Sequence, residues 1–276
     1  MVFNKPVSDM ALVTAAGRAK ESERSDCLVY DPYAKKLAGD SGMKLVEQFG
    51  DIFIDAEAIT TRVFDDAVIK FVEGGGTQIV VLGAGVDARP YRLQILRDRS
   101  IRWWEMDYEG VLSYKAGVLG DSKPLCMLVR IPTDILEKGL FQRLIDTGLN
   151  PELRTLWVAE GVFHYLRREE VAEFLETIHS ASSDGSTVFF SALSSSTKSH
   201  TGKFEDSMSY LRKMGAPMTF ALDDPRGLLE SHGYANIEVT FMGHHSAHYG
   251  RLPWPPAYEP LEGYPMHWYI KGDVKK

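Results

Sequence analysis

Carboxylate side chains recur along this 276-residue chain at the ends of short apolar runs. In chain order these acids are Asp87, Glu105 with Asp107, Asp134 and Glu160. Two glycines, Gly83 and Gly85, precede the first acid and would let a ligand lie close to the backbone. Carboxylates attract cationic centres, accept hydrogen bonds from hydroxyl groups and repel phosphate. The set therefore favours a ligand with a positive centre and a ribose, and without phosphate.

The apolar runs have the length and composition of buried strands. Strands are expected at 78–82, 101–106, 125–129, 155–159 and 187–191, with two more at 237–242 and 267–270. Helix-like segments at 108–119, 135–147 and 168–181 lie between them. Alternation of this kind is typical of an α/β fold with a Rossmann-like parallel sheet covered on both faces. Because ligands bind beyond the carboxyl ends of such strands, the acids are expected to meet at one edge.

The rest of the chain fits one domain, 1–276, built around this sheet. We expect a helical region at 1–75, a Rossmann-like core at 76–242 and a last strand at 267–271. The segments 192–218 and 243–266 are expected to form a cap or lid on the substrate side. The second of them is rich in proline and aromatic residues, and long irregular loops in compact domains are usually functional.

Composition excludes several classes of partner. The net charge of −7 and the mixed charges give no electrostatic basis for binding nucleic acid or an anionic membrane surface. No apolar run reaches the roughly 18 residues of a membrane span, and residues 1–19 lack a secretory apolar stretch. The two cysteines, Cys27 and Cys126, form no CxxC pair, so neither a disulfide framework nor a zinc–thiolate site is expected. A cytoplasmic location is the expectation.

S-adenosylmethionine fits the acidic edge, because it carries a sulfonium, an ammonium and a ribose but no phosphate. Its single carboxylate needs a cation, and Arg18 and Arg62 precede the glycine loop on expected helices. The spacing Gly83-x-Gly85-x-x-Ala88 also satisfies the loose dinucleotide pattern, with Glu105 twenty residues beyond Gly85. A nicotinamide-dependent oxidoreductase is therefore a rival hypothesis. Asp87 opposes it, because its charge would repel a pyrophosphate.

Each of these residues also has an ordinary structural reading when taken alone. Asp107 and Asp134 could cap the helices that follow them. Arg62 could pair with Asp65 or Asp66 on its own helix. Only the occurrence of the whole set in the right order favours a cofactor site.

The sequence resembles the leucine carboxyl methyltransferase family, and within it the branch of small-molecule O-methyltransferases of polyketide and other secondary metabolism. The resemblance runs from about Ala11 to Tyr234. It is carried by the segments TAAGRA at 14–19, DPYA at 31–34, TRVFDD at 61–66, VLGAGVDAR at 81–89, EMD at 105–107 and AEGVFHYL at 159–166. It implies a class I methyltransferase sheet of seven mostly parallel strands, the last one antiparallel.

The resemblance also implies roles for individual residues. The cofactor carboxylate would be bound by Arg62, with Arg18 as a further candidate, and its methionine portion would lie along Gly83 and Gly85. The ribose would be bound by Asp107 or Glu105, the adenine would be bordered by Asp134 and Ile135, and the methionine ammonium would be bound by Glu160. Asp87 completes the expected cofactor-binding set.

The expected reaction is methyl transfer to a carboxylate or hydroxyl of a small molecule, leaving S-adenosylhomocysteine. Two further rival hypotheses are a protein C-terminal carboxyl methyltransferase and a non-catalytic cofactor-binding protein. A hydroxyl acceptor would gain from a general base, for which His164 is the candidate. Candidate acceptor-binding residues are Tyr210, Met214, His245, Tyr249 and Trp254. No metal is expected, because no cysteine or clear carboxylate near His244, His245 and His248 completes a zinc site.

Overall fold

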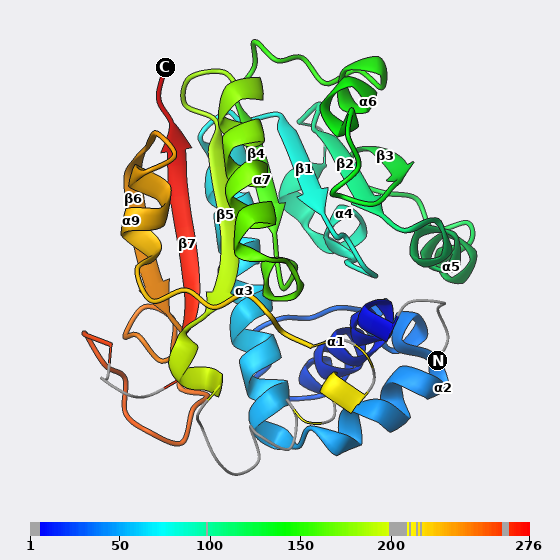
Figure 1. The fold of residues 1–276 in the computed structure, drawn as a ribbon. Helices are drawn as coiled ribbons and strands as arrows, with labels where there is room; N and C mark the ends of the chain where they lie inside the picture. Colours follow the sequence, from blue (N-terminus) through cyan, green and yellow to red (C-terminus); the bar gives the residue numbers. More distant parts are fainter. Residues whose placement is uncertain are drawn as a thin grey trace.

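A seven-stranded mixed sheet forms the centre of the computed structural model, which describes residues 6–97, 99–198, 209, 211–213, 215, 217–260 and 265–276 (Figure 1). Its strands are β1 (Gln78–Leu82), β2 (Arg102–Asp107), β3 (Met127–Pro132), β4 (Thr155–Ala159), β5 (Thr187–Leu193), β6 (Tyr234–Phe241) and β7 (His267–Val274). They lie in the order β3-β2-β1-β4-β5-β7-β6. The first five are parallel, and β7 runs antiparallel to both β5 and β6. The predicted fold is confirmed, and the order reverses between β1 and β4.

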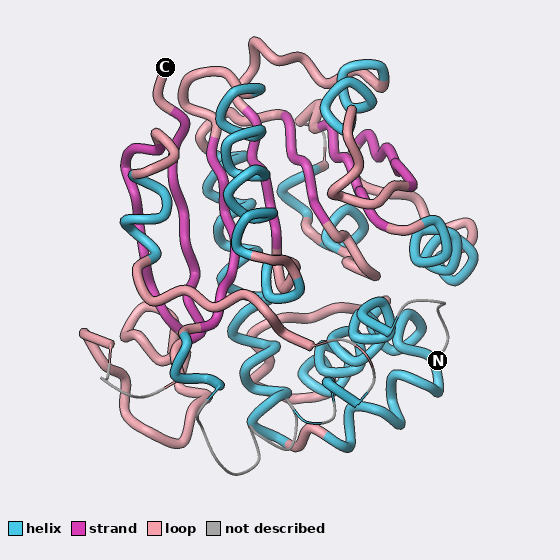
Figure 2. Tube along the Cα trace, in the orientation of Figure 1, coloured by secondary structure: helices cyan, strands magenta, loops and turns pink. Residues whose placement is uncertain are grey.

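Helices cover both faces of the sheet because both faces are apolar. Alternate strand residues point to opposite sides, so that Trp103 belongs to one buried cluster and Trp104 to another. Helix α3 (Asp51–Glu73) packs on the Trp103 side, and α7 (Arg168–Ala181) on the Trp104 side. The helices α4 (Arg89–Arg92), α5 (Glu109–Leu119), α6 (Leu140–Asp146) and α9 (Pro225–Glu230) complete the layers (Figure 2).

The N-terminal helices lie beyond the carboxyl ends of the parallel strands (Figure 1). Helix α1 (Pro6–Ser22) packs against α2 (Ala34–Leu45) and α3. Small residues such as Ala15 and Ala16 are fully buried in this contact, which lets the helices approach closely. The N-terminal region thereby stands directly opposite the edge where the acidic residues were expected.

Several element bounds differ from the expected ones. Strand β3 begins at Met127 rather than 125. The helix expected at 135–147 is confined to 140–146, because a turn closed by Glu137 N donating to Asp134 O (2.9 Å) occupies its first residues. The division of the chain into core and cap segments stays a prediction. No helix in the described ranges is long and apolar enough to cross a membrane.

Candidate cofactor and acceptor site

A cavity of about 1600 Å³ lies between the carboxyl edge of the sheet and the N-terminal helices. The loops after β1, β2, β3 and β4 all contribute to its wall, together with residues of α1 and α3. Four of the five predicted acids line it, namely Asp87, Asp107, Asp134 and Glu160. Parallel strands thus bring together residues that are up to 73 positions apart in the chain.

The loop after β1 is shaped by two glycines with left-handed backbone, Gly83 (φ 62°) and Gly85 (φ 50°). A Cβ atom at Gly83 would lie 2.5 Å from Cγ2 of Val162, so no side chain fits there. The Gly85 N–H donates to the Asp107 carboxylate at 2.7 Å, and the Tyr108 N–H donates to its other oxygen at 2.7 Å. Burial raises the pKa of Asp107, although these two hydrogen bonds act against the rise.

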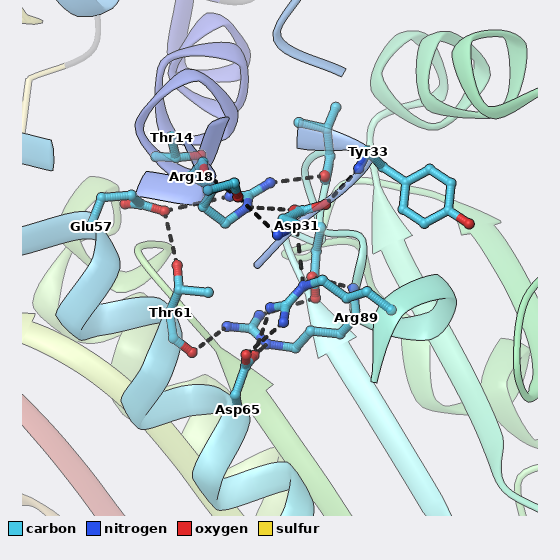
Figure 3. Close-up of polar contacts among 12 residues, drawn as sticks. Thr14, Arg18, Asp31, Tyr33, Glu57, Thr61, Asp65 and Arg89 are labelled. Carbon is cyan, nitrogen blue, oxygen red and sulfur yellow. Dashed lines mark hydrogen bonds and ion pairs between the residues drawn. The ribbon is translucent and has the colours of Figure 1, made fainter. Parts of the chain in front are cut away.

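A buried arginine, Arg89, neutralises part of the acidic edge. Its guanidinium contacts Asp65 at 2.6 Å and donates to Thr61 O at 3.2 Å (Figure 3). It also contacts Asp87 at 3.1 Å and Glu160 at 2.7 Å. Burial raises the pKa of Asp87, but the adjacent cationic side chains outweigh burial and bring it down to about 2. For Glu160 burial prevails, and its pKa is raised.

Arg18 lies in the cavity wall and is buried. It donates to Asp31 at 3.1 Å, to Glu57 at 3.4 Å and to Val86 O at 3.2 Å (Figure 3). A guanidinium has five N–H groups, so two of them have no partner in the described part of the chain. Burial also raises the pKa of Glu57 to about 7, despite the opposing charge of Arg18.

Two residues predicted to bind the cofactor do not line the cavity. Arg62 is half-exposed and pairs with Asp66 at 2.9 Å, one helical turn along α3, because its side chain projects from a different side of the helix than Glu57 does. Glu105 lies inside β2 and is fully buried in ion pairs with Lys115 (2.6 Å) and Arg130 (3.1 Å). Neither Arg62 nor Glu105 therefore lines the cavity, whereas Arg18 and Asp107 do.

The residues expected to border the adenine lie at the end of β3. Asp134 and Ile135 both line the cavity. The Tyr108 hydroxyl donates to Asp134 at 3.2 Å, and the Leu136 N–H donates to its other oxygen at 3.1 Å. This carboxylate is therefore held in place by the loops after β2 and β3.

On the acceptor side, His164 and Trp254 line the cavity, whereas His245 and Tyr249 do not. His245 is exposed against Tyr258, and the Tyr249 hydroxyl donates to Asp66 at 3.2 Å. The late loop leaves His245 at the surface and packs Tyr249 against the core beside α3, so neither ring lines the cavity. Tyr210 and Met214 lie outside the described residues. Within the described ranges, no three His, Cys, Asp or Glu side chains are placed to hold a metal ion.

Three further cavity residues went unnoticed in the sequence, namely Glu57, Arg89 and His267. Glu57 could have been found from helical spacing, because Glu57 and Thr60 are three residues apart on α3 and both line the cavity. Arg89 directly follows the glycine loop. His267 has no local signal, since only the pairing of β7 with β5 brings it to the cavity.

The sequence profile of the leucine carboxyl methyltransferase family matches residues 11–179. The chain belongs to this family. A relative from Mycolicibacterium vanbaalenii is 30% identical over 77% of this chain and 72% of its own length. A relative from Saccharopolyspora erythraea is 32% identical over 64% of both chains, and one from Parafrankia sp. is 35% identical over 65% of this chain and 61% of its own.

All three relatives are provisionally named S-adenosyl-L-methionine-dependent methyltransferases. The chain spans less than two thirds of the length of the relatives from Saccharopolyspora erythraea and Parafrankia sp.. The family match confirms the predicted family.

Solved structures support the fold. A DUF574 family protein from Streptomyces avermitilis superposes with a TM-score of 0.62 at 12% identity, over 95% of this chain and 97% of that protein. A provisionally named methyltransferase from Thermobifida fusca also superposes with a TM-score of 0.62, at 15% identity over 99% of this chain and 97% of that protein. At such identities the likeness concerns the fold alone.

Proposed function

We propose that this chain transfers the methyl group of S-adenosylmethionine to a carboxylate or hydroxyl oxygen of a small molecule. The observation that carries the proposal is the convergence of Arg18, the glycine loop, Asp107 and Glu160 on one cavity. The family supplies the class of reaction, and the cavity supplies the groups that this cofactor requires.

The residues present fit the cofactor. The cradle of Gly83 and Gly85 admits close approach by a ligand, and the unpaired N–H groups of Arg18 suit a carboxylate. Glu160 has a raised pKa and forms an ion pair with Arg89. The ammonium of the cofactor would give this carboxylate a second positive partner. Asp107 would accept hydrogen bonds from ribose hydroxyls, and Asp134 would border the adenine.

When bound, S-adenosylmethionine supplies an electrophilic methyl group on a sulfonium. The chain's own contribution is to hold donor and acceptor in line and to exclude water, and orientation alone can supply about 7–11 kcal/mol of a barrier. The fixed carboxylates Asp107 and Glu160 perform that orientation, because each is already restrained by hydrogen bonds or an ion pair. No covalent intermediate on the protein is needed.

The size of the cavity supports a small-molecule acceptor. A pocket for a single small ligand usually measures about 300–1,000 Å³. At about 1600 Å³ this cavity has room for the cofactor and a second molecule. Part of its wall is apolar and comes from the late loop, with Trp254 to Ala257. An acceptor from secondary metabolism and a cytoplasmic location remain predictions.

Methyl transfer from labelled S-adenosylmethionine tests the proposal. The protein is incubated with a panel of small carboxylic acids, phenols and alcohols, with a peptide ending in a free carboxylate as the competing acceptor. Label is expected in one or more small molecules and is expected to fall at least tenfold with Asp107→Asn, which removes one charged acceptor of the ribose. Label only in the peptide would favour a protein-methylating enzyme. Binding of reduced nicotinamide instead of S-adenosylmethionine would overturn the proposal.

A further inference from the structure

Two histidine rings lie side by side in the cavity wall. His164 belongs to the short helix η3 (Phe163–Tyr165), four residues after Glu160, and His267 is the first residue of β7, paired with Leu193 at the end of β5. Their ring centroids are 5.7 Å apart, with an interplanar angle of 68°. Two chain segments more than a hundred residues apart thus place imidazoles together beside the proposed cofactor site.

Both rings carry a nitrogen without a partner. Nδ1 of His164 and Nε2 of His267 are buried and make no hydrogen bond to any described residue. His164 is 96% buried, since only 4% of its surface is exposed. These two nitrogens are shielded from the cavity. A ligand hydroxyl would instead contact the opposite nitrogens, Nε2 of His164 and Nδ1 of His267, which are not sealed and make no hydrogen bond to a described residue.

The charges of the cavity disfavour a carboxylate at the same place. Seven carboxylates but only three arginines line the described wall. Arg89 is already paired with Glu160 and Arg167 with Glu170, and the remaining N–H groups of Arg18 are assigned to the carboxylate of the cofactor. An anionic acceptor would therefore enter a negative cavity without a cation of its own, which is costly in a low-dielectric site.

We propose that His164 and His267 form the acceptor-binding subsite, and that the acceptor presents a neutral hydroxyl on an apolar, phenol-like body. The inference rests on the proposed function and narrows it from carboxylate or hydroxyl to hydroxyl. The apolar body is matched by the neighbouring wall. Phe241, Met266 and Trp254 line the same cavity.

The state of the imidazoles agrees with this role. Burial lowers the pKa of His164 to about 4, and burial together with His164 lowers that of His267 to about 3. Both rings are therefore neutral at pH 7 and able to accept a hydrogen bond from a hydroxyl.

In the reaction the hydroxyl oxygen forms the bond to the methyl carbon. The C–S bond breaks with its electron pair going to sulfur, and the hydroxyl proton passes to an imidazole nitrogen and then to water. The charge lost by the sulfonium is gained by the imidazole, so the net charge of the site is conserved.

Binding to the protein saturated with S-adenosylhomocysteine tests this without knowledge of the natural acceptor. Protein with ¹⁵N-labelled histidine is titrated with 2-naphthol and with 2-naphthoate, which share a ring skeleton and differ in the acceptor group. Naphthol is expected to bind at least tenfold more tightly and to shift the ring ¹⁵N resonances of His164 and His267. His164→Gln and His267→Gln are each expected to weaken naphthol about tenfold, the worth of one hydrogen bond, while leaving naphthoate unchanged.

The matched control is His245→Gln, an exposed histidine outside the cavity wall, which is expected to change neither affinity. Unchanged affinity of each variant for S-adenosylhomocysteine shows that it has folded. Absence of naphthol binding, preference for naphthoate, or variants that bind naphthol as the unaltered protein does would each overturn the inference. Failure of S-adenosylhomocysteine to bind the unaltered protein would instead overturn the proposed function, so the two failures are distinct.

Discussion

Acidification is expected to destabilise this protein through its buried histidines. The folded state holds the pKa of His164 at about 4, against 6.5 for a free imidazole, because burial disfavours the charged ring. Between pH 6.5 and 4 the unfolded chain therefore binds a proton that the folded chain does not. Each unit by which the pKa differs between the folded and unfolded states is worth about 1.4 kcal/mol. The free energy of unfolding lost over this pH range is therefore about 3 kcal/mol for this ring alone.

The assay is urea unfolding, followed by tryptophan fluorescence at several values between pH 7 and pH 4. The free energy of unfolding of the unaltered protein is expected to fall by about 3 kcal/mol more than that of His164→Gln, which cannot take up the proton. Such a loss is a large part of the roughly 5–15 kcal/mol that stabilises a typical domain. The control His245→Gln, at an exposed position, should follow the unaltered protein. Curves for the unaltered protein and His164→Gln that stay parallel within about 1 kcal/mol would refute the reasoning.

Three further predictions concern the cofactor side. Arg18→Ala should weaken S-adenosylmethionine binding at least about thirtyfold by calorimetry, because a charged hydrogen-bonding partner is lost, whereas Arg62→Ala should change it less than about twofold. Gly83→Ala should lower stability by roughly 1–3 kcal/mol in thermal unfolding, because its left-handed backbone and close neighbour leave no room, whereas Gly110→Ala, with nothing within 4 Å, should be neutral or slightly stabilising. Glu57→Gln should gain stability relative to the unaltered protein as pH rises from 4.5 to 7, because the raised pKa of this carboxyl makes its ionisation unfavourable to folding; no pH-dependent gain would contradict its burial.

The sheet was the part of the molecule most accessible from sequence. The strands at 78–82 and 155–159 have the expected bounds because their residues are all buried on both faces and form continuous apolar runs. The acids at the strand ends followed from the same pattern, since parallel strands deliver their next residues to one edge. Asp107 and Glu160 could therefore be placed in the cavity without any knowledge of distances.

The errors arose where a side chain's direction decides its role. Arg62 follows Thr61 by one residue, and a helix turns about 100° in that step, so the arginine points to Asp66 at the surface. Glu105 lies two residues before the carboxyl end of β2, and its side chain is buried in an ion pair with Lys115. His267 depends on β5 and β7 pairing over more than seventy residues, and no local periodicity reports such a contact.

Calorimetric titration with S-adenosylmethionine and S-adenosylhomocysteine tests the central claim most directly, using the unaltered protein and Glu160→Gln. The account predicts that both ligands bind the unaltered protein. Their affinity should fall at least about tenfold in the variant, because the ammonium loses a charged partner. Heats of binding that are absent for both ligands with the unaltered protein, or equal in the two proteins, would contradict the assignment of this cavity to the cofactor.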